Sequence, residues 1–245
     1  MCSSDLQFGT LASLYPDRID LGVGRAPGTD QVTWQALRRH ATTDVNEFPR
    51  DVVELQHYLK APQEGQRVVA TPGAGTNVPI WILGSSLFGA QLAGMLGLPF
   101  AFASHFAPAA LDQAIAIYRE KFEPSEQLAE PYVMLGYNVC AAASDEEANY
   151  LRTSSLQSFV NLRRGVPGKL PPPVAGYEEQ LSAAERAMVQ ELSRCAAVGS
   201  PASVKSQIDD FLNQTKADEL IIVSSVFEHE ARQRSYEITA DVLNL

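Results

Sequence analysis

The sequence predicts an α/β protein in which parallel strands alternate with helices. Short apolar runs recur along the chain, each followed by a turn containing Gly, Ser or Pro and, after most of them, by a segment with the apolar spacing of a helix. Tyr132–Ala141 is almost continuously apolar, which is typical of a strand covered on both faces of a parallel sheet. The chain has 245 residues, 45% of them hydrophobic, which is enough for one sizeable domain.

The apolar runs place five strands. They are expected at Ile19–Val23, Pro79–Leu83, Pro99–Ala103, Tyr132–Ala141 and Glu219–Ser224, with Val68–Ala70 as a candidate for a short extra strand in a long Pro- and Gly-rich loop. Five strands suit an open sheet, whereas a (β/α)8 barrel needs eight. Composition and periodicity alone leave both architectures open.

Helices are expected between and after these strands. Their predicted ranges are Phe48–Leu59, Leu87–Leu96, Leu111–Phe122, Ser144 to about Arg164, Ser182–Cys195, a helix from Pro201, and Glu230–Leu243. Ser144, followed three residues later by Glu147, indicates a capped helix start. Gly97 fits the position just past a helix end, and Ser200 with Pro201 fits an N-cap and first turn.

Composition excludes several classes of function. A net charge of −10 disfavours nucleic-acid or anionic-membrane binding. We expect no transmembrane helix, because no apolar run reaches about 18 residues. Met1–Leu6 lacks the features of a signal peptide, and three widely spaced cysteines suit the cytoplasm. His40, His57 and His229 show no ligand spacing, so we expect no metal site.

The first chemistry-bearing stretch ends the first strand. Gly24-Arg25-Ala26-Pro27-Gly28 presents a cation where α/β proteins bind their ligands. A dinucleotide fingerprint would need Gly at position 27, which is Pro27. The simpler alternative is a tight turn with a solvated or salt-bridged Arg25.

The second stretch, Gly84-Ser85-Ser86, ends the next strand. A nucleophile elbow would need Gly at position 88, which is Phe88, so a serine hydrolase is disfavoured. Two hydroxyls at a helix start favour an anion site instead; the simpler alternative is that one serine only caps the helix. Because parallel strands end on one face, Arg25, Ser85 and Ser86 together predict a phosphate site.

Three later residues are candidates for a substrate pocket. His105 follows the third strand on the same face, where it binds substrate or, alternatively, is hydrogen-bonded at the loop base. Tyr137 and Asn138 are polar residues late in an otherwise apolar strand.

Several stretches resemble the bacterial luciferase-like family of flavin-dependent monooxygenases. They are RIDLGVGRAPGTD (Arg18–Asp30), PIWILGSSLFGAQLAGMLGLPFAFASHFAP (Pro79–Pro108), PYVMLGYNVCAAASDEEA (Pro131–Ala148) and VGSPASVKSQIDDF followed by ADELIIVSS. The resemblance covers nearly the whole chain from Gln7 onward. It is strongest to the broad group of luciferase-like oxidoreductases.

The resemblance implies a (β/α)8 barrel that uses reduced FMN, or a deazaflavin in some branches, with molecular oxygen and a small organic substrate. A separate reductase supplies the flavin, and a homodimer is common. Arg25 falls on the family's phosphate-binding arginine, and Ser85 and Ser86 fall on its phosphate-binding serine loop, with Leu87 as a backbone donor. The implied activity is that of a monooxygenase; the alternative is a non-catalytic flavin-binding or dimerisation protein of the same fold.

The resemblance also numbers the strands. Ile19–Val23 matches the fourth barrel strand, so we expect an incomplete barrel of strands four to eight, a fragment with impaired catalysis. Residues 1–6 match nothing in the family and are expected to be an artefact, with residues 7–245 forming the barrel domain. The family's catalytic histidine follows the second strand and has no match here, which leaves His105 as a weak candidate.

Overall fold

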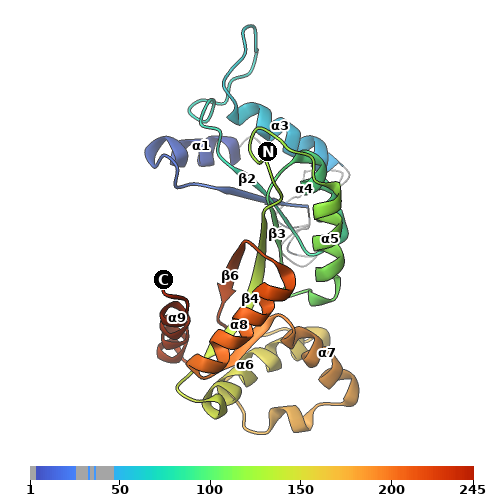
Figure 1. Cartoon of the computed structure of the whole chain (residues 1–245), viewed down its shortest axis with the longest axis vertical. Helices are drawn as coiled ribbons and strands as arrows, with labels where there is room; N and C mark the ends of the chain where they lie inside the picture. The colour runs from blue at the N-terminus through green and yellow to red at the C-terminus, as the bar shows by residue number, and fades with distance from the viewer. Residues whose placement is uncertain (1–3, 26–32, 34–35, 37–46) are drawn as a thin grey trace. The chain divides into compact units, whose positions relative to one another are not determined.

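The computed structural model describes residues 4–25, 33, 36 and 47–245. Its contacts divide the chain into two compact units. Unit 1 comprises Met1–Ala101 and Gln113–Tyr132, and unit 2 comprises Phe102–Asp112 and Val133–Leu245. Parallel strands alternate with helices, as the sequence predicts, and Figure 1 traces this order by colour.

Unit 1 is built on a parallel strand pair. Its elements are α1 (Ser4–Leu14), β1 (Leu21–Gly24), α3 (Phe48–Leu59), β2 (Ile80–Gly84), α4 (Leu87–Leu96), the start of β3 (Phe100–Phe102) and most of α5 (Leu111–Lys121). Strand β2 lies between β1 and β3, and Gly24 of β1 stands opposite Leu83 of β2. The ends of β1 and β2 therefore lie side by side.

The core of unit 1 lies between this sheet and its helices. Ile80, Ile82, Phe100 and Tyr118 are all at most 1% exposed. The Tyr118 hydroxyl donates to the Leu98 carbonyl (3.0 Å) and accepts from a backbone N–H, so its burial leaves no polar atom unsatisfied. Val68–Ala70 forms no strand.

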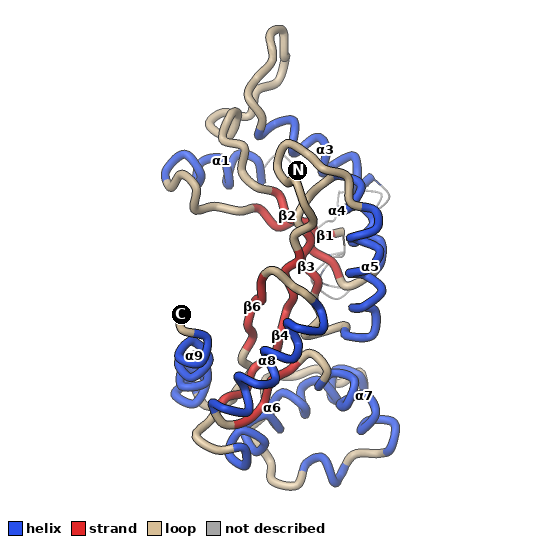
Figure 2. The backbone as a smooth tube through the Cα atoms, in the orientation of Figure 1, coloured by secondary structure: helices blue, strands red, loops and turns tan. Residues whose placement is uncertain are grey.

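Unit 2 is built on β4, its longest strand. Its elements are η2 (Pro108–Ala110), β4 (Val133–Ala141), α6 (Asp145–Arg163), η3 (Tyr177–Gln180), α7 (Ala183–Ser193), β5 (Ala196–Gly199), α8 (Pro201–Thr215), β6 (Glu219–Val223) and α9 (His229–Leu243). Strand β4 pairs in parallel with β5 on one side and β6 on the other. Figure 2 shows β6 beside β4, with α8 and α9 nearby.

Helices cover both faces of β4. The Tyr137 ring packs against Phe211 of α8, with centroids 4.4 Å apart. On the other face, the Cys140 thiol contacts the Ala148 carbonyl of α6. Successive side chains of a strand point to opposite faces, so α6 covers the face that also carries Asn138.

Strand β5 is missing from the sequence prediction. It has only four residues, and three of them, Ala196, Ala197 and Gly199, have low strand propensity. The Gln207 side chain of α8 accepts from Val198 N–H (3.1 Å) and donates to Val198 C=O (3.0 Å). These bonds satisfy the backbone of Val198 on the edge of β5 that faces away from β4.

The helix signals in the sequence are largely confirmed. The Ser144 hydroxyl accepts from Glu147 N–H at the start of α6 (3.2 Å), and Ser182 forms a full capping box with Glu185. Gly97 ends α4 in the left-handed region. No helix among the described residues is long and apolar enough to cross a membrane.

Candidate active site

Arg25 lies at the end of β1, beside the first turn of α4. Its guanidinium carbon is 4.0 Å from the centroid of the Phe88 ring. Phe88 is the second residue of α4, which begins directly after Ser85 and Ser86. The structure thus brings the predicted cation to the predicted serine turn within unit 1. The following Ala26, Pro27 and Gly28 lie outside the described residues.

The N-terminus of α4 has no side-chain cap. Ser86 has the extended backbone of an N-cap residue, yet its hydroxyl makes no cap hydrogen bond. Ser85 and Ser86 are both exposed. The first N–H groups of α4, that of Leu87 included, therefore face outward with the positive end of the helix dipole. This geometry disfavours the simple capping alternative and suits an anion.

Two glycines bring the turn close to its support. Gly84 ends β2 and Gly89 lies in the first turn of α4. A Cβ at either position would lie 3.5–3.6 Å from the Phe100 ring, so both backbones rest against this buried ring. The Phe100 ring therefore packs close to the backbone on both sides of the Ser85–Ser86 turn.

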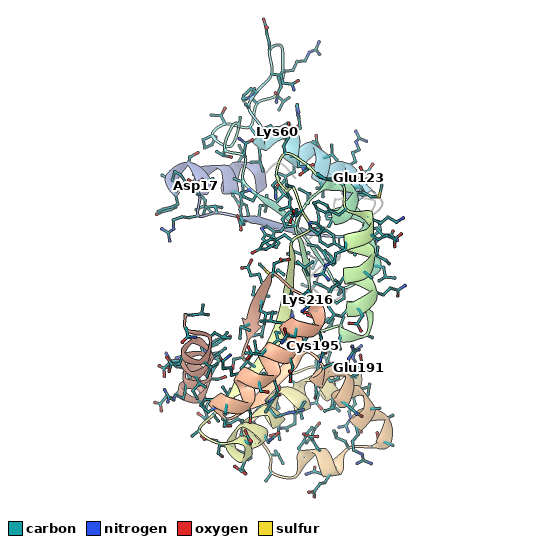
Figure 3. The ribbon with its side chains drawn as sticks, in the orientation of Figure 1. Asp17, Lys60, Glu123, Glu191, Cys195 and Lys216 are labelled. Carbon is teal, nitrogen blue, oxygen red and sulfur yellow. The ribbon has the colours of Figure 1, made fainter. Side chains whose placement is uncertain are left out.

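Unit 2 contains a separate cavity of about 400 Å³. It lies between α6 and the face of β4 and β5 that carries Asn138. Residues that line it come from the turn after β3, β4, α6, the segment 167–170, the end of α7, β5 and the end of β6. Two residues at the end of α7, Leu192 and Ser193, reach the cavity. In the chain they lie between Glu191 and Cys195, which Figure 3 labels.

His105 and Asn138, both predicted as pocket residues, line this cavity. The Asn138 amide donates to the His105 carbonyl (2.9 Å), and the Ser104 hydroxyl donates to the Gly136 carbonyl (2.6 Å). A Cβ at position 136 would overlap the His105 imidazole, so only glycine leaves the ring its place. These bonds fix the turn at the edge of the cavity.

The His105 imidazole is partly buried. Its Nδ1 atom lies against Gly136 with no hydrogen-bond partner among the described residues. Burial lowers the pKa of His105, because desolvation disfavours the imidazolium. This shift favours the uncharged ring at neutral pH.

Tyr137 lies away from the cavity. It is 1% exposed, its ring packs on Phe211, and its hydroxyl donates weakly to the Gln207 carbonyl (3.4 Å). Strand alternation gives it the face opposite Asn138. The structure therefore places Tyr137 in the packing of β4 against α8 instead of in the pocket.

Three residues of α6 that the sequence did not single out also line the cavity: Arg152, Ser155 and Phe159. Their helical spacing puts them on one face of α6, and this pattern was the available signal. Cys140 reaches the cavity as well, but burial raises its pKa to about 12, so it is a neutral thiol. No group of acidic, His or Cys side chains that could hold a metal occurs in the described ranges.

Unit 1 and unit 2 each show parallel strands alternating with helices, which defines the chain as an α/β protein. The chain belongs to the luciferase-like monooxygenase family, whose model matches residues 6–219. It is 49% identical over 236 residues to a luciferase-like monooxygenase of Escherichia coli K12, covering 96% of this chain and 70% of the relative.

Solved structures confirm the predicted (β/α)8 barrel class. The apo-MsnO8 crystal structure is 31% identical, with a TM-score of 0.87 over 100% of this chain and 75% of that chain. A 3,6-diketocamphane monooxygenase component from Pseudomonas putida, solved with FMN, has 17% identity and a TM-score of 0.64 (97% and 73% covered). An F420-dependent secondary alcohol dehydrogenase has 15% identity and a TM-score of 0.62 (99% and 74%).

Proposed function

We propose that the chain is a flavin-dependent monooxygenase that binds the phosphate of reduced FMN at the turn after β2. One observation carries the proposal: Ser86 leaves the start of α4 uncapped while Arg25 stacks on Phe88 beside it. A phosphate there accepts from the Leu87 N–H and the two serine hydroxyls and pairs with the guanidinium. The residues present therefore fit a flavin phosphate.

Bound reduced flavin would supply the electrons that activate molecular oxygen for insertion into an organic substrate. The residues of this chain bind and orient. Arg25, Ser85, Ser86 and Leu87 hold the phosphate. The cavity of unit 2 takes the substrate, with the neutral His105 and the Asn138 amide at its edge. A separate reductase is the proposed source of the reduced flavin.

The test compares FMN with riboflavin, which lacks the phosphate. Both are reduced and titrated anaerobically into the protein. We expect Arg25→Ala to weaken FMN binding about 10- to 100-fold, the range for a charge-assisted hydrogen bond, and to leave riboflavin binding unchanged. Arg18→Ala is the matched control, because Arg18 stacks on Tyr15 before β1. Its removal should leave the affinities for FMN and riboflavin unchanged. Equal FMN affinity in wild type and Arg25→Ala would show the phosphate assignment to be wrong.

Two further measurements refine the proposal. Competition by deazaflavin F420 against FMN separates the two cofactor classes. Oxygen consumption with reduced flavin and a substrate panel separates a monooxygenase from a non-catalytic flavin-binding protein of the same fold.

A further inference from the structure

The wall of the cavity in unit 2 carries a positive charge, although the protein as a whole is acidic. The chain carries a net charge of −10, with 29 acidic and 19 basic side chains. Yet the described residues that line the cavity include no Asp or Glu, and Arg152 of α6 is their one formally charged side chain at neutral pH. An anion in this cavity would meet a cation and no carboxylate of the lining, since Glu178, which pairs with Arg152, lies outside that lining.

A hydrogen bond holds Arg152 in place but occupies only part of its hydrogen-bonding capacity. Its Nη2 donates to the Ser193 hydroxyl (2.9 Å), and Ser193 in turn donates to the Val189 carbonyl (2.8 Å). Glu178 forms a long ion pair with Arg152, 4.0 Å from Nη2, which is too long for a hydrogen bond; the Glu178 side chain is 51% exposed, against 16% for Arg152. A guanidinium has five N–H donors, so most of them have no partner within the described structure.

The rest of the cavity is mainly apolar. Leu156, Phe159, Leu162, Leu170 and Val198 contribute to its wall. Its volume of about 400 Å³ is at the small end for ligand pockets. A ligand that matches this lining combines one anionic group with a short hydrocarbon body.

We propose that the cavity binds a small amphipathic carboxylic acid, with its carboxylate on Arg152 and its hydrocarbon part against Leu156 and Phe159. A planar guanidinium suits a carboxylate because two parallel N–H groups meet its two oxygens. Ser193 is then a positioning residue that holds the guanidinium. The identification of this acid as the substrate rests on the proposed monooxygenase function.

The test uses octanoate and octan-1-ol as probes, titrated by calorimetry into the flavin-free protein. They share the hydrocarbon chain and differ in the charged group. We expect wild type to bind octanoate at least about tenfold more tightly than octan-1-ol. Arg152→Gln should remove that preference and leave octan-1-ol binding unchanged. Arg164→Gln is the matched control: it removes a charge at the end of the same helix, where Arg164 pairs with Glu185 (2.7 Å).

Two outcomes overturn the proposal. If wild type bound octan-1-ol as tightly as octanoate, the cavity would have no preference for a charged ligand. Equal loss of both probes in Arg152→Gln shows that Arg152 only supports the fold. If thermal melting shows Arg152→Gln to be unfolded, Arg152→Lys, which keeps the charge, decides: it must still prefer octanoate. Because no flavin is present, this result is independent of the FMN titration with Arg25→Ala.

Discussion

The proposed phosphate site of unit 1 and the cavity of unit 2 differ in how far apart in the chain their parts lie. Ser85, Ser86 and Leu87 are consecutive, and Arg25 ends the neighbouring strand. The cavity collects residues from positions 105 to 225. The proposed anion site therefore needs only two adjacent turns, whereas the cavity needs residues from most of a folded unit.

The largest expected effect is on the packing beneath the turn after β2. Phe100→Ala should lower the free energy of unfolding by about 3–5 kcal/mol, because Phe100 is fully buried and supports Gly84 and Gly89. Urea denaturation measures this loss. Phe106→Ala is the control, since Phe106 is 48% exposed. Equal losses in the two variants would show that the turn has no rigid support.

The next effect is on the edge of the cavity. Gly136→Ala should cost about 1–3 kcal/mol of stability, because the added methyl group displaces the His105 ring. Gly168→Ala is the control: a Cβ there meets nothing within 4 Å, so denaturation should show a change within about 0.5 kcal/mol. If Gly136→Ala left the free energy of unfolding unchanged, the His105 ring would be able to move aside at no energetic cost.

The helix starts of the two units offer a third comparison. Ser144→Ala should destabilise the protein by about 1 kcal/mol, because Ser144 caps α6. Ser86→Ala should leave stability unchanged, because Ser86 makes no cap bond, and should weaken only the binding of reduced FMN. Denaturation and flavin titration of the same two variants check both statements. A stability loss in Ser86→Ala would make that serine a simple cap.

The smallest effect is a pH dependence of stability. Burial holds the pKa of His105 below its ordinary 6.5, so the unfolded chain takes up the proton first as the pH falls. This contribution to stability is present above pH 6.5 and is lost at lower pH. In His105→Gln, the drop in unfolding free energy between pH 7.5 and pH 5 should be smaller than in wild type. An unchanged drop would show that His105 is solvated.

The sequence predicted the proximity of Arg25 to the serine turn, whereas it did not predict most of the cavity lining, and the difference has a physical reason. Arg25, Ser85 and Ser86 follow apolar runs directly, and parallel pairing is enough to bring them together. Tyr137 was misplaced because polarity alone does not say which face of β4 a residue takes, although alternation against Asn138 was available as a signal.

The cavity-facing role of Arg152 could not be read from one helix. Its helical spacing with Ser155 and Phe159 is visible, but a charge on an amphipathic helix is usually solvated. Only the packing of α6 against β4 and β5 shows where that face lies. Strand β5 was missed for a related reason, since Gln207 completes its pairing from α8.

The Gln207 carboxamide also bears on self-association. An unpaired strand edge is a template onto which a second molecule can add a strand. By occupying both the N–H and the C=O of Val198, Gln207 removes the pairing groups at the middle of the β5 edge. The same side chain that completes β5 within one molecule thus guards it against sheet extension between molecules, and so against aggregation.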